Sequence, residues 1–390
     1  MLTVKGTIIL SIRAQLIIEE DSMKEFIELT EEFSRRIEEM ENQRKKLGDF
    51  LREVSSSTNL PPDRDIFEEK IILPMENLDL ANMKIAGVDG GLVKHTLHGL
   101  DIMLLRAVGV IFYYKDGKLE KVDYHPDAIP SPNPRIFFDP FTDLEFEINS
   151  NYERQLTEVK NATEVIDKFE PDILFLNGSV VPHYTERPPE HSLLFPTYKK
   201  LIEAYANLFK KCEEKKTALA GVIEDSRGTR FCEVINEKLM LKIPNELVEI
   251  KLLLNKTKDT NLLTYALKLK ERSFLFRYSS SPDQHPILKE FGGKIANSIF
   301  CFYLKTAEFD RPIRVDFLAE KDFTKIANFI SSILLSLSGH SSYGMPSVLI
   351  EADQRAKLSE KDLEMFYLDL INRAGNLPGL FTLRREQRPF

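Results

Sequence analysis

Asp89 is the first residue of this sequence whose type and position suggest chemistry. It follows a short apolar run in the motif Ile85-Ala-Gly-Val-Asp-Gly-Gly91, and such a run predicts a buried strand. A buried carboxylate is unfavourable unless it is paired, hydrogen-bonded or bound to a cation. Gly90 and Gly91 allow the chain to turn sharply and a ligand to approach the backbone. Asp89 is therefore either the cap of a turn or a metal ligand.

A second run of the same shape favours the metal ligand. The motif Asp172-Ile-Leu-Phe-Leu-Asn-Gly-Ser179 places Asn177 and a glycine after four apolar residues. Two strands that each end in an oxygen-bearing side chain can meet side by side at one edge of a sheet. An amide oxygen binds a hard cation but brings no charge, so we expect weaker metal affinity than with an aspartate.

Two metal ions that cleave a phosphodiester need three or four oxygen ligands from different elements, which hold the ions ~4 Å apart. The helix predicted before Asn177 carries Glu153 and Glu158. We favour Glu158, because it lies between apolar Leu156 and Val159 at the edge of the predicted buried face. The alternative for both glutamates is an ordinary solvated carboxylate.

Asp353 is the fourth candidate ligand. It lies among apolar neighbours in the motif Ile350-Glu-Ala-Asp-Gln-Arg-Ala356, on a helix predicted at residues 348–358. The alternative is an ordinary carboxylate in the N-terminal half of a helix.

A third apolar run, residues 220–223, leads into further charged residues at the same predicted rim. Arg227 suits a phosphate contact, because its guanidinium fork matches two oxygens. A salt bridge to Glu224 or Asp225 is the alternative for this arginine. Asp225 is also a secondary candidate ligand, around which the metal site would be rebuilt if Asn177 were only a turn residue.

Two tyrosines belong to the helix predicted at residues 198–212. Tyr198 and Tyr205 could stack on a base or hold a phosphate. Packing in the core or on the surface is the alternative for each ring.

The order of the predicted elements indicates the fold class. An early strand at residues 85–89 is followed by a long strand at 101–114, a hairpin turn at 115–118 and a partner strand at 119–124. A surface excursion at 126–140, a strand at 144–148 and a helix at 152–169 come next. We expect an α/β protein with an RNase H-like core and a mixed sheet, in which parallel strands follow helices. Later strands are predicted at 173–176, 218–223, 274–278, 299–304 and 313–318, and later helices at 323–337, 348–358 and 360–373.

Residues 22–54 form a long amphipathic pattern, with apolar residues at helical spacing between charged ones. The helix either packs on its own domain or forms an arm that pairs with another subunit. We therefore divide the chain into an N-terminal strand and long helical arm at 1–75 and an RNase H-like domain at 76–390. A helical insertion is predicted at about 229–270.

Composition places the protein among soluble globular chains of the cytoplasm. The 390 residues carry a formal net charge of −8, and no apolar run approaches a membrane span. Cys212, Cys232 and Cys301 are scattered, which fits neither a disulfide framework nor a zinc cluster. A dedicated nucleic-acid coat would be basic, whereas an enzyme that grips DNA in a cleft needs only local positive charge.

Five motifs in this order and spacing resemble the NurA nuclease family of archaea and some bacteria. The resemblance covers about residues 80–357 and implies an RNase H-like nuclease that uses Mn²⁺, with Mg²⁺ as the alternative. It implies single-strand endonuclease activity and 5′–3′ exonuclease activity on single- and double-stranded DNA. It also implies a homodimer that works with a hexameric HerA-type translocase in DNA end resection and break repair. The motifs are residues 85–91, 175–179, 181–189, 220–227 and 345–353.

Our leading hypothesis is a metal-dependent DNA nuclease whose catalytic metal ligands are Asp89, Glu158 and Asp353, with Asn177 completing the shell. Family members usually have aspartate in place of Asn177, often histidine in place of Asp353, and often serine in place of Gly91. Asp353 could restore the charge that Asn177 lacks. The alternative is a catalytically weakened protein that serves as a DNA-binding clamp or adaptor for the translocase.

Overall fold

The computed structural model describes residues 3–57, 59–60, 65–138, 141–183, 187–239 and 252–374. Its strands are β1 Ile72–Pro74, β2 Lys84–Thr96, β3 Asp101–Lys115, β4 Lys118–His125, β5 Asn133–Phe137, β6 Ile173–Asn177, β7 Ala218–Ile223, β8 Glu271–Ser273, β9 Phe276–Arg277, β10 Ile299–Leu304 and β11 Ile313–Leu318. Within the described residues they form one 11-stranded sheet, in the order β1-β8-β10-β11-β7-β6-β2-β3-β4, with β5 beside β3 and β9 beside β10.

The pairing directions confirm the predicted mixed sheet. Strands β2, β3 and β4 are antiparallel neighbours, and the hairpin turn between β3 and β4 has positive φ at Asp116 and Gly117. Strand β6 is parallel to both β2 and β7. The antiparallel strands come first, and the parallel strands follow helices, as the sequence predicts.

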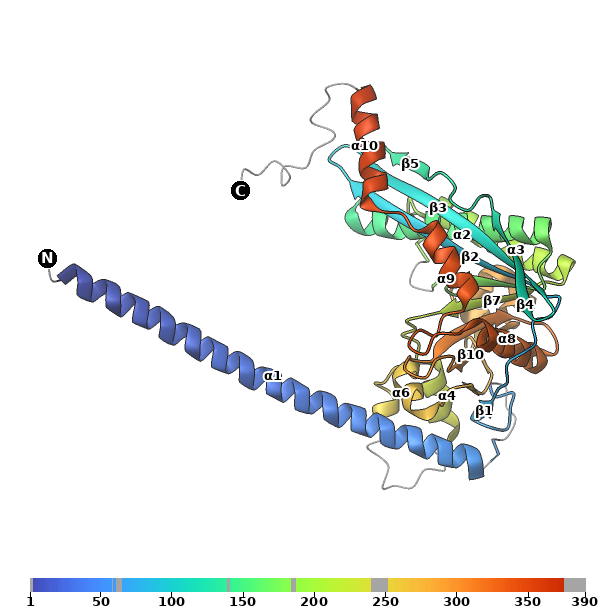
Figure 1. Cartoon of the computed structure of the whole chain (residues 1–390), viewed down its shortest axis with the longest axis horizontal. Helices are drawn as coiled ribbons and strands as arrows, with labels where there is room; N and C mark the ends of the chain where they lie inside the picture. Colours follow the sequence, from blue (N-terminus) through green and yellow to red (C-terminus); the bar gives the residue numbers. More distant parts are fainter. Residues whose placement is uncertain are drawn as a thin grey trace.

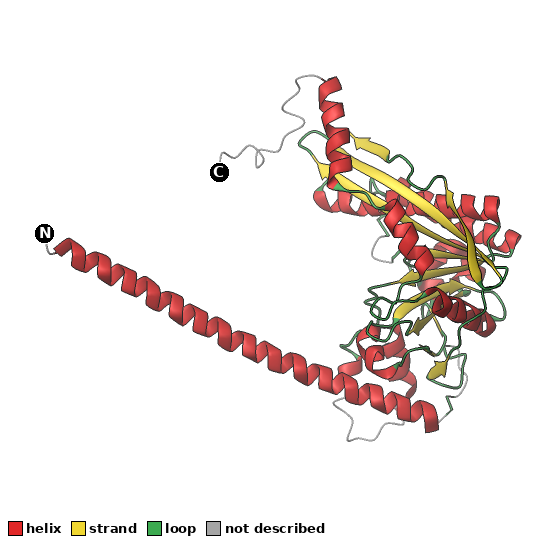
Figure 2. Ribbon diagram, viewed as in Figure 1, coloured by secondary structure: helices red, strands yellow, loops and turns green. Residues whose placement is uncertain are grey.

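Helices cover both faces of this sheet (Figures 1 and 2). Helices α2 Asp143–Phe169 and α3 Phe195–Lys215 lie on one face, and α8 Phe323–Leu337 and α9 Ser347–Ala356 on the other. Successive strand residues point to opposite faces. Leu174 and Leu176 of β6 therefore pack in the α2/α3 layer, whereas Phe175 packs in the α8/α9 layer.

The predicted strand at residues 144–148 is wrong, because helix α2 already includes them. Thr142 begins the helix with a capping box: its side chain accepts from the Glu145 backbone N–H, and the Glu145 side chain accepts from the Thr142 backbone N–H. The alternation of apolar residues that suggested a strand instead places Phe146 in the core and leaves Leu144 exposed. Thr142, followed by a glutamate three residues later, is the sequence signal for the start of a helix that the strand prediction overlooked.

Two other strand predictions also need correction. The predicted surface excursion at 126–140 contains β5, which pairs with β3 from Asp101↔Phe137 to Leu105↔Asn133. The predicted strand at 274–278 is instead the two short strands β8 and β9. Both strands pair with β10 but at different points: Arg272 is opposite Leu304, and Phe276 is opposite Cys301. Residues 274–275, between the two strands, are not part of a strand.

The long helix α1 spans Thr3–Ser57 and projects far from the sheet (Figure 1). The predicted N-terminal strand is wrong, because these residues belong to the helix. The predicted insertion is helical at α4 Arg230–Leu239 and α6 Asp259–Ala266, while residues 240–251 lie outside the described part. The last turns of α1 anchor it, with Leu47 and Leu51 in the same core cluster as residues of α4 and α6.

The remaining elements close the fold around the ends of the sheet. Helix α10 Glu360–Ala374 packs against the far ends of β2 and β3 through a small apolar cluster. The shorter helices are η4 Pro282–Gln284, η5 Leu288–Phe291 and α7 Gly292–Ala296. None of the helices in the described ranges combines the length and apolarity needed to cross a bilayer.

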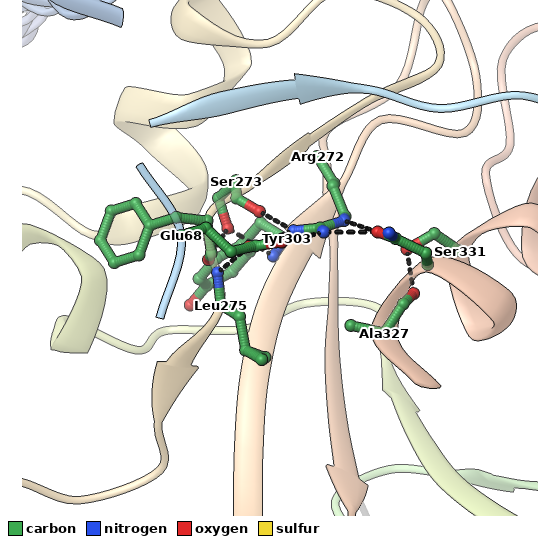
Figure 3. Close-up of polar contacts among 9 residues, drawn as sticks. Glu68, Arg272, Ser273, Leu275, Tyr303, Ala327 and Ser331 are labelled. Carbon is green, nitrogen blue, oxygen red and sulfur yellow. Dashed lines mark hydrogen bonds and ion pairs between the residues drawn. The ribbon is translucent and has the colours of Figure 1, made fainter. Parts of the chain in front are cut away.

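A buried ion pair fastens the segment before β1 to the sheet (Figure 3). Arg272 is fully buried on β8; its Nη1 donates to Oε2 of Glu68 at 2.7 Å and its Nε to Oδ1 of Asn328 on α8 at 3.2 Å. The same Glu68 oxygen accepts from the backbone N–H of Leu275 at 2.8 Å. Three segments that are distant in sequence therefore meet at one guanidinium.

Removing this guanidinium should be strongly destabilising. In Arg272→Met, Glu68 becomes a buried charge without its cation, and we expect a loss of about 3–5 kcal/mol in the free energy of unfolding. Arg311→Met is the control, because Arg311 pairs with Asp225 on the surface, where ion pairs contribute little. Urea denaturation measures both, and equal midpoints for the two variants would contradict the assignment.

Candidate active site

The two residues predicted to meet do lie side by side, although β2 continues past Asp89. Val88 of β2 is in register with Leu176 of β6, so the next residues, Asp89 and Asn177, are neighbours on one face. Nδ2 of Asn177 donates to Oδ2 of Asp89 at 2.9 Å, and the backbone N–H of Gly90 donates to Oδ1 at 2.7 Å. The carboxylate is only 5% exposed. Its burial is thus compensated by two hydrogen bonds.

The two glycines after Asp89 admit helices from opposite faces. A Cβ at Gly90 would lie 2.5 Å from Oε1 of Glu158 on α2. A Cβ at Gly91 would lie 2.0 Å from the carbonyl oxygen of Ala356 on α9. The expectation of a sharp turn here is wrong, because β2 continues to Thr96. Glycine is needed for close packing rather than for chain reversal.

An arginine that the sequence analysis did not consider accompanies Glu158. Arg154, one turn earlier on α2, forms an ion pair with Oε1 of Glu158. The side chain of Arg154 is 30% exposed and that of Glu158 only 10%. The spacing of four residues, with opposite charges on a helix face, was the available signal.

Burial dominates the electrostatics of both carboxylates. Burial raises the pKa of Asp89 to about 6, against the opposing hydrogen bonds from Asn177 and Gly90. Burial likewise raises the pKa of Glu158 to about 8, while the Arg154 charge opposes the shift and Asp89 adds to it. The charge of Asp89 thus disfavours that of Glu158, a situation that a bound cation would relieve.

Asp353 lies on α9 and is exposed, rather than enclosed by apolar neighbours as predicted. Its charge contributes to raising the pKa of Asp89, so the α9 carboxylate acts electrostatically on the site. Among the described residues no three His, Cys, Asp or Glu side chains gather closely enough to hold a metal ion. The donor set therefore depends on Asn177 as well as on carboxylates.

The chemistry of these donors fits a hard divalent ion. Asp89 and Glu158 offer carboxylate oxygens, and oxygen donors suit magnesium and manganese. The amide nitrogen of Asn177 is bonded to Asp89, which leaves its Oδ1 as the remaining acceptor. A cavity of about 150 Å³ opens beside Glu158 and Asn177, and its polar lining also includes Arg154, Gln155, His183 and Tyr205.

The other charged candidates lie apart from this donor set. Glu153 points to Arg135, with 3.7 Å between Oε2 and Nε, on the side of α2 that faces a different cavity. Asp225 pairs with Arg311 at 2.6 Å. Arg227 is exposed, and in the described part of the chain it forms no ion pair with Glu224 or Asp225. The preference for Glu158 over Glu153 agrees with this arrangement.

Neither tyrosine presents an open ring face. Tyr198 is 1% and Tyr205 4% exposed, and both belong to the core between α2, α3 and the sheet. The Tyr198 ring packs against Tyr152 and Phe195. The alternative of core packing therefore holds for both rings, although Tyr205 also lines the cavity.

A buried pair behind Asn177 was also missed by the sequence analysis. Asp316 of β11 is fully buried and accepts from Nε of Arg314 at 2.7 Å and from Oγ of Ser179 at 2.7 Å. Ser179 follows Asn177 by two residues, so this bond holds the loop after β6. Arg314 and Asp316 share one face of β11, a separation of two that strand periodicity permits.

In this mixed sheet, Asp89 lies where β2 and β6 adjoin, and Glu158 of α2 lies against the neighbouring Gly90. The model of the NurA domain matches residues 83–358, and the chain belongs to the NurA family. The family resemblance inferred from the five motifs is thereby confirmed, and the protein is a DNA nuclease by family.

The chain is similar to solved structures of NurA proteins. The NurA nuclease from Sulfolobus solfataricus is 16% identical, with 89% of this chain and 98% of that one covered, at a TM-score of 0.54. A second NurA structure is 12% identical, with 90% and 98% covered and a TM-score of 0.49. A structure of NurA bound to dAMP and manganese is 13% identical, with 87% and 95% covered and a TM-score of 0.42. No curated protein matches the chain.

Asp89→Asn should stabilise the metal-free protein. A raised pKa means that the folded state disfavours the charged form of Asp89. The charged carboxylate therefore lowers the stability of the folded protein above pH 6, and this loss disappears as the pH falls towards 4. At pH 8 we expect the variant to gain about 3 kcal/mol. Thermal melts in EDTA at pH 8 and pH 4.5 measure the gain and its loss, and a variant that melts below wild type at pH 8 would contradict it.

Proposed function

We propose that this protein cleaves DNA phosphodiesters with a divalent metal ion, Mn²⁺ or alternatively Mg²⁺. The supporting observation is the contact between Asp89 and Asn177 beside Glu158 and its cavity. Asp89, Glu158 and Asn177 are the proposed ligands, with Asp353 completing the shell. A divalent ion held by them would supply an activated water and stabilise the charge on the leaving oxygen.

The residues of the chain prepare the reaction in two ways. Asp89 is fixed before any ion binds, because the N–H of Gly90 and the amide of Asn177 hold both of its oxygens. Glu158 is held against the backbone of Gly90 by helix α2. Such pre-organised ligands require little rearrangement when the ion and the substrate arrive. Single- and double-stranded DNA are the proposed substrates, with 5′–3′ polarity and single-strand endonuclease activity.

Matched glutamates on one helix test this function. We expect Asp89→Ala to abolish cleavage and Glu158→Gln to reduce it severely, because each loses a charged oxygen ligand. Glu153→Gln should cleave like wild type, since Glu153 faces Arg135 instead. Assays use linear single- and double-stranded DNA with Mn²⁺ or Mg²⁺, and circular dichroism checks the fold. Equal activity of Glu158→Gln and Glu153→Gln would overturn the ligand assignment.

A clamp or adaptor without catalysis is the second candidate function. It is favoured by Asn177, which brings no charge to a position where the family usually has aspartate. The same assays decide between the two functions. If wild-type protein binds DNA but leaves it intact, both alone and with a HerA-type translocase, the clamp replaces the nuclease.

We also propose a homodimer, in which α1 contacts the second copy. From residue 23 to residue 51, alternating steps of three and four define one stripe along α1, which is the spacing of a helix–helix seam. The last two positions, Leu47 and Leu51, are fully buried against their own domain. The same stripe continues outward on the projecting part, where the exposed apolar residues are Met23, Phe26, Phe33, Ile37 and Met40.

An apolar stripe on a projecting helix is unfavourable in water unless another surface covers it. We expect wild type to have the mass of two chains and Phe33→Glu/Ile37→Glu to have the mass of one. Arg35→Glu is the control, because it changes charge on the opposite side of the helix. Light scattering at low micromolar concentration gives the masses. A wild-type monomer, or a dimer that survives the double substitution, would refute this interface.

The proposed cellular role is end resection during break repair with a hexameric HerA-type translocase in the cytoplasm. Family membership over residues 83–358 supports this role. The three cysteines are free and buried, which suits a reducing compartment. Co-elution of the purified protein with such an ATPase, and faster resection in its presence, would support the partnership.

A further inference from the structure

We propose that Arg154 contacts a phosphate group of the DNA in this active site. The inference rests on the proposed nuclease function and names a residue of the chain that binds the substrate there. Arg154 lines the cavity of about 150 Å³ together with Glu158 and Asn177, two of the proposed metal ligands. In the proposed reaction the phosphodiester binds next to those ligands, so a side chain in this cavity lies close to it.

The guanidinium of Arg154 has donors left for a ligand. Arginine carries five N–H donors in a planar fork. Within the described part of the chain, Arg154 forms one hydrogen bond, from Nη1 to Oε1 of Glu158. Its side chain is 30% exposed and lines the cavity, which leaves other N–H groups accessible. Two of them can donate to two oxygens of one phosphate.

Arg154 is also the permanent cation of this cavity. Among the described residues that line it, the other basic side chain is that of His183. An imidazole is charged only when protonated, whereas a guanidinium stays charged at any physiological pH. Arg135, on β5, pairs with Glu153 beside a different cavity. Arg154 is therefore the arginine placed to meet a phosphate at the proposed metal ligands.

The acidic surroundings make such a cation favourable. The negative charge of Glu158, and after it that of Asp89, raises the pKa of Arg154. A phosphate that approaches these carboxylates is repelled by their negative charge. A guanidinium held next to them attracts the phosphate and stabilises the negative charge that develops during cleavage.

A purely structural role is the competing explanation. Opposite charges four residues apart stabilise a helix by small amounts, and such a role involves no phosphate. It predicts that loss of Arg154 changes the binding of ligands with and without a phosphate to the same extent. Two small ligands that differ only in the phosphate therefore separate the explanations.

The experiment compares thymidine 5′-monophosphate with thymidine by isothermal titration calorimetry. Neither ligand contains a phosphodiester, so neither is cleaved, and Mn²⁺ is present at a concentration that saturates each variant. Arg154→Gln should bind the monophosphate about tenfold more weakly than wild type, because it loses hydrogen bonds to a charged group. The affinity for thymidine should stay the same.

Two further variants refine the result. Arg154→Lys should bind the monophosphate with an affinity between those of wild type and Arg154→Gln, because it keeps the charge but loses the fork. Arg135→Gln is the control and should bind both ligands like wild type, since Arg135 pairs with Glu153 outside the cavity.

The proposal is overturned if Arg154→Gln binds the monophosphate as tightly as wild type, or if its affinity for both ligands falls equally. If this variant fails to fold by circular dichroism, Arg154→Lys replaces it, and wild-type affinity for the monophosphate then contradicts the contact. Active cleavage by wild type together with either contrary result sinks only this inference. The expected loss of affinity, combined with a wild type that leaves DNA intact, sinks the proposed function and retains the phosphate contact.

Discussion

The close approach of two helices to strand β2 is the constraint on which the site depends. Gly90 allows Glu158 of α2 to lie against the strand, and Gly91 allows the end of α9 to do so on the other face. A side chain at Gly91 would meet the backbone of α9, and one at Gly90 would displace the Glu158 carboxylate. Asp89, just before them, therefore stands in a strand enclosed from both faces, and its burial follows directly from the packing.

Burial of Asp89 and Glu158 in this enclosed site makes their negative charges unfavourable, and neighbouring groups compensate those charges. Two carboxylates with pKa values raised mainly by burial are balanced by the amide of Asn177, the N–H of Gly90 and the charge of Arg154. Behind the site, Arg314 and Asp316 form a second buried pair that holds Ser179. Charges are thus compensated next to where they arise, by groups of the same strands and helix.

The periphery is organised by a different physical effect. Helix α1 is joined to the body by Leu47 and Leu51, while the apolar stripe of its projecting part faces solvent. On the sheet side, Arg272 and Glu68 connect the segment before β1 to β8 and α8. Hydrophobic burial therefore fixes one end of helix α1. A buried ion pair fixes the segment before β1 to the sheet.

Sequence by itself determined the sheet's main strands, β6, β7, β10 and β11 among them, because uninterrupted apolar runs leave few alternatives. It also predicted that Asp89 and Asn177 are neighbours, which the hydrogen bond between them confirms, because strand periodicity is short-range. Only the tertiary structure revealed Arg154, the burial of Tyr198 and the purpose of Gly90 and Gly91. Those features depend on which elements come together across long stretches of chain, and local spacing carries no record of such contacts.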